Sequence, residues 1–188
     1  MLPALKTLIL KLRNQRIYDN ALAIRRDILT SMFKPERIVI HDSDSAFGNV
    51  FMINDWHEKR GFLWTHMGSG TRVHAGYHYL IYNGRLWTST EYDEKYDGTV
   101  VPCRPDVEGA HCSANGRNRD SLGICLIGPS FTAKQVSSLF RLIAELRQEY
   151  GIDIDKITGH SEEDPANKKD PRFNMEKFRA LLSQVTAK

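Results

Sequence analysis

The sequence predicts a single-domain α/β fold: a central mixed β-sheet flanked by helices, with a helical extension at the N-terminus. Apolar runs at residues 37–41, 76–82 and 121–128 are short and end at polar or Gly-containing segments, as buried strands do. Between them lie segments with apolar residues at helical spacing, most clearly at residues 132–150. Strands and helices that intermix along 188 residues favour one sheet with helices on its faces.

In the N-terminal half, residues 3–31 are expected to form one or two basic amphipathic helices, because Leu5, Leu8 and Leu12 recur at helical spacing. Lys34-Pro35-Glu36 then marks a break. An Asn-Gly pair between two apolar runs is a strong hairpin signal. The elements expected next are a strand at residues 37–41, a helix at 49–59, a loop at 61–70, a strand at 76–82, a turn at Asn83-Gly84 and a return strand at 85–88.

In the C-terminal half, Thr132 and Gln135 have the spacing of a helical capping box, and Gly151 is a helix stop signal. The long segment before them is expected to be an irregular connection, which in a domain of this size is usually functional. In order, the expected elements are this connection at residues 92–118, a strand at 121–128, a helix at 132–150, a strand at 155–158 and a helix at 175–182.

Charge is unevenly distributed along the chain. Residues 1–34 carry seven Lys/Arg and two Asp, a net charge of +5, so the remainder carries −2 of the total +3. This balance argues against a nucleic-acid partner, and we expect a monomer. The basic segment has three interpretations: an extra helix packed on the domain, an element that binds an anionic membrane or lipopolysaccharide surface, or a helix that docks a partner.

The cysteines and the N-terminus bear on the cellular compartment. Three cysteines cannot form a complete disulfide framework, and Cys125 lies in an apolar run typical of a buried thiol. We therefore expect synthesis in a reducing cytoplasm. Lys11, Arg13 and Arg16 interrupt the first apolar stretch, so no secretory signal is expected, and no run has the length of a transmembrane helix.

Two histidines and one aspartate are candidate metal ligands. His41 ends the strand at residues 37–41, and His160 and Asp170 lie in a Pro-bounded loop after the strand at residues 155–158. Two imidazoles and one carboxylate are a ligand set of catalytic zinc sites, which leave a fourth position open. Taken singly, His41 is also typical of a buried packing histidine, and His160 with Asp170 of a polar surface loop.

Several segments together resemble the zinc N-acetylmuramoyl-L-alanine amidases, which include phage lysozyme-type amidases and share a fold with peptidoglycan recognition proteins. The resemblance covers residues 36–182, so we divide the chain into an extension, residues 1–35, and a catalytic domain, residues 36–188. The segments that carry it occur in the family's order, at residues 38–41, 56–62, 76–79, 109–111, 118–128 and 159–171.

The resemblance implies one Zn²⁺ per chain, held by His41, His160 and Asp170, and two catalytic residues, Tyr77 and Lys168. The implied reaction is hydrolysis of the amide between N-acetylmuramic acid and L-alanine by a zinc-activated water. Lys168 would stabilise the developing oxyanion, and Tyr77 would position the water or relay its proton. Without the resemblance, Tyr77 is typical of a packed strand residue and Lys168 of a solvated lysine.

Substrate contacts are predicted in the loop that contains Gly109-Ala110-His111. His111 matches a family histidine near the substrate groove, and its alternative is an ordinary loop histidine. Asn115 and Arg117 lie beside it and are expected to contact sugar or peptide. His57, His74 and His78 are expected to be packing or surface residues.

The chain also departs from the lytic phage enzymes. These often have a cysteine as third ligand, whereas Asp170, ten positions after His160, resembles the ligand of cytoplasmic recycling amidases. Recycling enzymes, however, have a catalytic glutamate where this chain has Cys125. We favour a phage or prophage endolysin that acts on the cell wall in host lysis. The alternatives are a recycling amidase, a non-catalytic muropeptide binder and a regulator that docks another protein.

Overall fold

Five strands form a mixed sheet in residues 33–65 and 70–186, which are the residues that the computed structural model describes. The strand order is β5-β4-β6-β1-β7; β4, β6, β1 and β7 run parallel, and β5 pairs with β4 in the antiparallel direction. The predicted mixed sheet is therefore confirmed. The strands are β1 (Arg37–Asp42), β4 (Tyr79–Asn83), β5 (Asp97–Pro102), β6 (Ser121–Leu126) and β7 (Ile157–Gly159).

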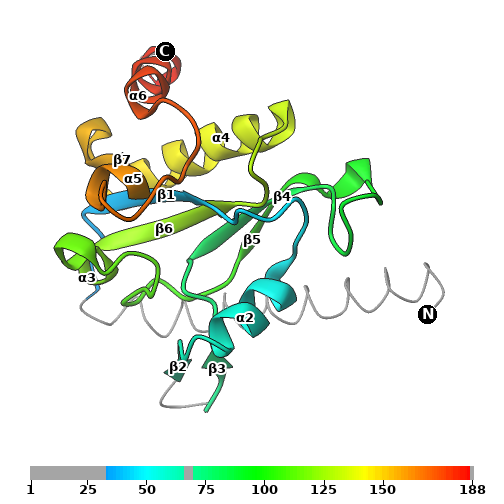
Figure 1. Cartoon of the computed structure of the whole chain (residues 1–188). Coiled ribbons are helices and arrows are strands. Elements are labelled where there is room, and N and C mark those ends of the chain that lie inside the picture. Colours follow the sequence, from blue (N-terminus) through cyan, green and yellow to red (C-terminus); the bar gives the residue numbers. More distant parts are fainter. Residues whose placement is uncertain (1–32, 66–69, 187–188) are drawn as a thin grey trace.

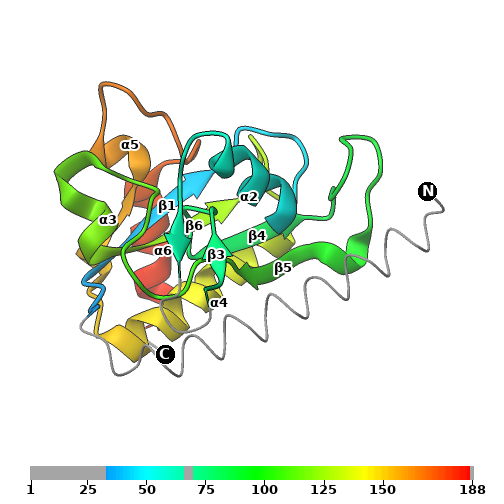
Figure 2. The same ribbon diagram turned by 90° about the horizontal axis from the view of Figure 1, so that it is seen from below.

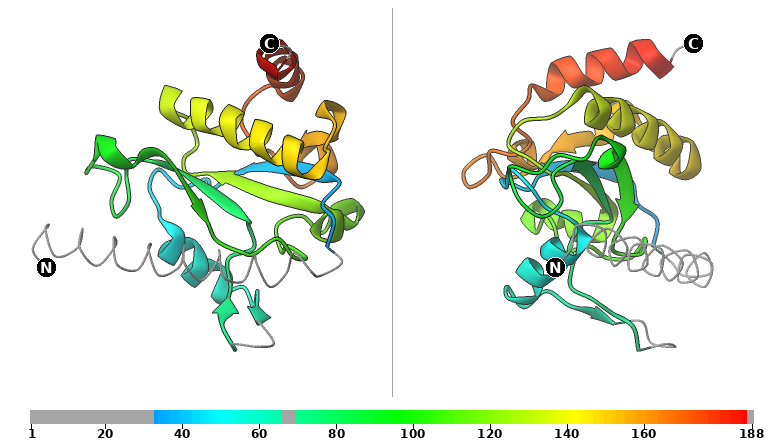
Figure 3. Two further views of the ribbon diagram at one scale, coloured as in Figure 1. Left: turned by 180° about the vertical axis from the view of Figure 1, so that it is seen from behind. Right: turned by 90° about the vertical axis from the view of Figure 1, so that its right-hand side faces the viewer.

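Helices cover both faces of this sheet (Figure 1). Helices α4 (Ala133–Tyr150) and α6 (Met175–Thr186) lie on one side, and α2 (Val50–Glu58) lies on the other, as the end-on view in Figure 3 shows. Each side has its own apolar core, one around Leu139 and Ile143 of α4 and one around Ile53 of α2. The central strands β1 and β6 are buried on both faces, which explains their continuous apolar sequences.

Short elements lie at the ends of the sheet. A two-stranded hairpin projects beyond α2 in Figure 1, and in the view from below in Figure 2 its strand β3 lies in front of the sheet. The hairpin consists of β2 (Trp64–Thr65) and β3 (Arg72–Val73). The short helices are η1 (Glu94–Tyr96), η2 (Ala114–Gly116), α3 (Arg117–Asp120), η3 (Ile154–Lys156) and α5 (His160–Glu163).

The ends of α4 form as predicted. The Thr132 side chain accepts a hydrogen bond from the Gln135 N–H, and the Gln135 side chain accepts one from the Thr132 N–H. At the other end Gly151 has a φ of 70°, a left-handed conformation that glycine adopts without steric cost. Gln135 also donates to the carbonyls of Ile81 and Ile127, which anchors the first turn of α4 to the sheet.

The predicted return strand at residues 85–88 is wrong. Asn83-Gly84 does form a turn, but the Arg85 carbonyl accepts a hydrogen bond from the Gly48 N–H, and the Leu86 carbonyl accepts one from the Asn49 side chain. These backbone groups therefore bind the segment before α2 instead of pairing with β4. The partner of β4 is β5, within the connection that was expected to be irregular.

Strand β5 and two other short elements cannot be recognised from the local sequence. A glycine at position 98 and a proline at position 102 bound its apolar residues, and both are unusual inside strands, although an edge strand tolerates them. Strand β2 lies in the segment predicted as a loop at residues 61–70, and α5 lies in the loop predicted after the strand at 155–158.

Several expectations concern residues outside the described part. The helices predicted within residues 3–31 fall entirely outside it, so the division between an extension and a catalytic domain stays a prediction. The three cysteines are all buried free thiols. Within the described residues, no helix combines the length and apolar character that crossing a membrane requires.

Candidate metal centre and active-site cleft

Strand register places two predicted metal ligands side by side. Ile40 of β1 pairs with Gly159 of the parallel strand β7, so the residues that follow, His41 and His160, lie together at the carboxyl ends of the strands. Their ring centroids are 4.5 Å apart. His41 is fully buried, and His160 begins α5. Sites in α/β proteins commonly open at this end of a parallel sheet.

Asp170 completes the group from the loop between α5 and α6. Its Oδ2 lies 3.0 Å from His41 Nδ1 and 3.1 Å from His160 Nδ1. Its backbone carbonyl accepts a hydrogen bond from the Ser161 N–H at 2.7 Å, which holds the loop against α5. One donor atom from each of the three residues lies within 4.8 Å of the others. The structure therefore brings together the three side chains that the sequence predicts as ligands.

The electrostatics of this group suit a cation. Burial lowers the pKa of His41 from 6.5 to about 4, which keeps its imidazole neutral at physiological pH. Burial raises the pKa of Asp170, but hydrogen bonds with His160 and His41 outweigh this effect and hold the pKa below its ordinary value. A neutral ring nitrogen and an ionised carboxylate are the protonation states in which these groups bind metals.

One side of the group is open to a cleft of about 610 Å³, which His160 and Asp170 line together with Tyr77, His111 and Lys168. Two imidazoles and one carboxylate with an open side are the arrangement of a catalytic rather than a structural metal site. The donor set therefore fits a divalent ion, and the open side leaves room for water and substrate.

A third histidine, His111, contacts His41 on the side of the ring that faces away from Asp170. His41 Nε2 lies 3.0 Å from His111 Nδ1, and His111 Nε2 lies 3.4 Å from the Ser121 carbonyl. With a cation held at Nδ1, the His41 hydrogen would be on Nε2 and would be donated to His111. Burial lowers the pKa of His111 well below its ordinary value, so His111 is neutral and able to accept. Gly123 makes room for this ring, since a Cβ there would lie 2.5 Å from it.

Tyr77 lies on the other side of His41, with ring centroids 5.0 Å apart. Cys125, which pairs with His41 in the register of β1 and β6, is close enough to the Tyr77 hydroxyl for each group to affect the pKa of the other. Burial raises the pKa of Tyr77 well above its ordinary value. The phenol is therefore protonated at neutral pH and can donate a hydrogen bond.

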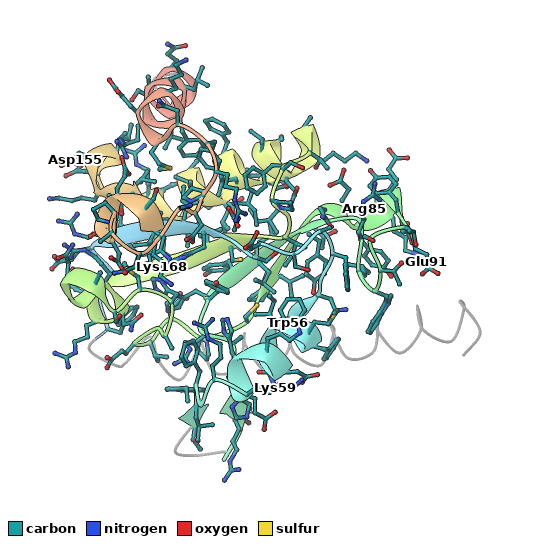
Figure 4. The ribbon with its side chains drawn as sticks, viewed as in Figure 1. Trp56, Lys59, Arg85, Glu91, Asp155 and Lys168 are labelled. Atoms are coloured by element: carbon teal, nitrogen blue, oxygen red, sulfur yellow. The ribbon has the colours of Figure 1, made fainter. Side chains whose placement is uncertain are left out.

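Lys168 lines the same cleft from the loop after α5, where Figure 4 shows it. Its backbone N–H donates to the Asp164 carbonyl at 2.9 Å, and its positive charge contributes to the low pKa of His41. Within the described residues, no carboxylate forms an ion pair with its ammonium group. Lys168 therefore places a positive charge near the three candidate ligands.

The sequence did not predict the two ion pairs that Arg172 forms beside the candidate ligands. Arg172 Nη1 lies 2.7 Å from Asp42 Oδ1, and Arg172 Nη2 lies 2.6 Å from Asp44 Oδ1. Asp42 follows His41, and Arg172 follows Asp170 by two positions, so the pair joins the two segments that supply ligands. The sequence has charged residues close to both candidate ligands, but only the fold shows that these charged residues contact each other.

Asn115 and Arg117 lie beside the cleft and do not line it. The Asn115 side chain donates to Glu163 Oε2 at 3.0 Å, and Arg117 Nε donates to the same oxygen at 2.8 Å. Because Glu163 belongs to α5, these contacts tie the loop at η2 to the helix that begins with His160. Their predicted contact with substrate stays a prediction.

The remaining histidines pack as expected. His57 Nδ1 accepts a hydrogen bond from the Gly76 N–H at 2.7 Å, and His78 Nδ1 accepts one from the Gly123 N–H at 2.9 Å. His74 contacts the Phe62 carbonyl at 2.6 Å. None of the three belongs to the group of candidate ligands.

Fold and site together define a class of protein: a mixed-sheet α/β domain with a candidate catalytic metal centre and a lysine beside it. The chain belongs to the N-acetylmuramoyl-L-alanine amidase family, whose model matches residues 31–173. It is accordingly an amidase that acts on peptidoglycan. The match includes all three candidate ligands and spans the whole sheet.

Individual relatives agree with this assignment. The endolysin of Enterobacteria phage T3 is 29% identical over 172 residues, which cover 82% of this chain and 95% of that protein. The N-acetylmuramoyl-L-alanine amidase LysC from Clostridium intestinale URNW superposes with a TM-score of 0.60 at 26% identity, over 80% of this chain and 87% of that one. The ectodomain complex of peptidoglycan recognition proteins LCa and LCx shares the fold, with a TM-score of 0.52 at 21% identity over 74% and 77%.

Proposed function

We propose that this protein is a zinc-dependent amidase that cleaves the bond between N-acetylmuramic acid and L-alanine, and that it acts as a phage or prophage endolysin. The observation that carries the proposal is the convergence of His41, His160 and Asp170 at the floor of an open cleft. Likeness to phage endolysins supports the second part. In this function the protein is made in the cytoplasm and acts on the cell wall after release.

In this proposal the three ligand residues hold one zinc ion. When bound, zinc supplies Lewis-acid chemistry, which polarises the amide carbonyl and makes water a stronger nucleophile near neutral pH. His41 and His160 contribute ring nitrogens, and Asp170 contributes the negative charge that the site needs. His111 fixes the orientation of His41 by accepting its Nε2–H, a support that metal-bound histidines usually have.

Lys168 and Tyr77 are the proposed catalytic residues. Attack on the amide places negative charge on the carbonyl oxygen, and the Lys168 ammonium group, which lines the cleft without a carboxylate partner among the described residues, would stabilise that charge. Tyr77 is a neutral donor at the metal position, where its hydroxyl would orient the attacking water or pass a proton. Burial raises the pKa of the Cys125 thiol well above its ordinary value, so this thiol stays protonated and takes no proton from the water.

The alternatives are less well supported. A non-catalytic binder needs no complete ligand set, yet all three donors are present in this chain. A recycling amidase is expected to have a carboxylate at the position of Cys125, where the structure has a buried thiol against Tyr77. Docking of another protein has no supporting observation in the described residues.

The decisive experiment measures metal and activity on the same preparation. We expect about one zinc per chain by elemental analysis, and release of L-alanine-terminated stem peptides from peptidoglycan. Removal of zinc with a chelator should abolish release, and added zinc should restore it. Asp170→Asn should lose both metal and activity, whereas Asp155→Asn, an exposed and distant aspartate shown in Figure 4, should keep both. Full activity without metal would overturn the proposal.

For the basic extension we propose contact with an anionic membrane or lipopolysaccharide surface. The support is its charge alone, because it lies outside the described residues. Phe33 packs against the core and stacks on His78 with ring centroids 6.1 Å apart, so the test should delete residues 1–32 and keep Phe33. Lost lysis of outer-membrane-bearing cells with unchanged thermal stability and purified-wall activity supports this role; unchanged lysis contradicts it.

A further inference from the structure

Four aromatic rings form a continuous row along one wall of the cleft, starting at the metal position. The ring centroids of His41 and Tyr77 are 5.0 Å apart, and those of Tyr77 and His57 are 5.1 Å apart. His57 then contacts Phe62 at 5.0 Å. Tyr77, His57 and Phe62 all line the cleft, so the row forms part of its surface.

The row ends at a cation. The guanidinium carbon of Arg60 lies 5.0 Å from the centroid of the Phe62 ring, and Arg60 also lines the cleft. Stacking on a ring restricts a guanidinium group to one orientation and leaves its N–H edge free to bind an anion. Phe62 therefore pre-orients Arg60 at a fixed place on this wall.

Arg60 differs from the other arginine in the cleft. Arg172 forms ion pairs with Asp42 and Asp44, whereas Arg60 forms no ion pair with any described residue. Its charge nevertheless acts along the row, because it contributes to the low pKa of His57. An oriented guanidinium without a carboxylate partner, inside a substrate cleft, is suited to bind an anionic part of the substrate.

We propose that Arg60 binds a free carboxylate of the peptidoglycan stem peptide and thereby selects among stem peptides. The inference rests on the proposed function, which places the scissile amide at the metal position. A stem peptide leaving that position carries two carboxylates, the α-carboxylate of the γ-linked D-glutamate and the carboxylate of the third residue. An extended peptide advances about 3.3–3.6 Å per residue, so both follow the scissile bond within a few residues along the wall.

The test uses three soluble muramoyl tripeptides: one with both carboxylates free, one with the D-glutamate α-carboxyl as an amide, and one with the third-residue carboxyl as an amide. Initial rates give kcat and KM for the full-length wild-type protein and for Arg60→Gln. Loss of a charge-assisted hydrogen bond predicts a KM about tenfold higher for Arg60→Gln on the doubly free substrate, with kcat within about twofold.

The amidated substrate that lacks the recognised carboxylate should show no difference between wild type and Arg60→Gln, and this identifies which carboxylate is bound. Arg60→Lys should recover part of the loss, because it restores charge without the planar fork. Lys59→Gln is the matched control: Lys59 is the exposed neighbour at the end of α2, shown in Figure 4, and does not line the cleft. It should behave as wild type.

Two results would overturn the inference: an equal KM change on all three substrates, or no change on any. Thermal unfolding of each variant shows whether it is folded. If Arg60→Gln is not, Arg60→Lys replaces it in the comparison with the wild type. Should the wild type cleave none of the substrates, the proposed function fails separately. Calorimetric binding of the same peptides then decides the role of Arg60: lost discrimination in Arg60→Gln supports it, and equal affinities refute it.

Discussion

His41 Nε2 lies 3.0 Å from His111 Nδ1, so a candidate metal ligand contacts a buried neutral histidine that is not itself in the ligand group. The sequence suggests a substrate contact for His111, and it does line the cleft. Its hydrogen bonds, however, give it a second task, which is to set the orientation and tautomer of His41.

His111→Ala should therefore weaken zinc binding about 10–100-fold, the usual cost of losing a supporting partner of a metal-bound histidine. Competition with a fluorescent chelator measures this affinity directly. His111→Gln retains an oxygen acceptor and should recover part of it. Unchanged zinc affinity in His111→Ala, with the fold intact by circular dichroism, would show that His41 needs no such support.

Gly123→Ala tests the same contact from the strand below it. A Cβ at this position would lie 2.5 Å from the His111 ring, so the ring or β6 must shift. Overpacking of this kind costs about 1–3 kcal/mol of stability, and displacement of His111 should also lower zinc affinity. Gly48→Ala is the control, since its Cβ would have a nearest neighbour at 3.4 Å. Urea unfolding and chelator competition should separate the two variants; equal behaviour would refute the argument.

Lys168→Met and Lys169→Met form a matched pair in one loop. Lys168 is half-buried and influences His41, whereas Lys169 is exposed. Removing a group that stabilises an oxyanion typically lowers kcat about 10²–10³-fold, and we expect this for Lys168→Met with zinc content unchanged. Lys169→Met should stay within about threefold of wild type. A similar loss in both variants would indicate a general charge effect of the loop.

The stability of the metal-free protein should fall as pH decreases from 6.5 to 4, in part because of His57. Burial, with smaller effects from Arg60 and Arg104, lowers the pKa of His57 from 6.5 to about 4. In this window the unfolded chain binds a proton that the folded chain does not, so the unfolding free energy decreases on acidification by up to about 1.4 kcal/mol per pH unit.

Urea unfolding at pH 7 and pH 5 in the presence of EDTA measures this effect. His57→Gln can still accept the Gly76 N–H bond but does not titrate, so its stability should fall less between the two pH values. His41, His78 and His111 also have lowered pKa values, and they leave some pH dependence in the variant. Identical pH slopes in wild type and variant would contradict the assignment.

Local sequence was sufficient for much of the fold. The apolar runs of β1 and β6 and the capping box and glycine stop of α4 are visible in a few consecutive residues, and the structure confirms them. Strand β5 was not predictable in this way. Its glycine and proline are tolerated because it is an edge strand, and edge position depends on which partner β4 selects.

By itself, the sequence determined the kinds of side chain available at the site: two imidazoles and a carboxylate, with a lysine two positions before the aspartate. Only the tertiary structure decided where they meet. The parallel register of β1 and β7 places His41 beside His160, and the Arg172–Asp42 pair joins the loop of Asp170 to the end of β1. Register and side-chain partners depend on residues far apart in the chain, so no local pattern encodes them.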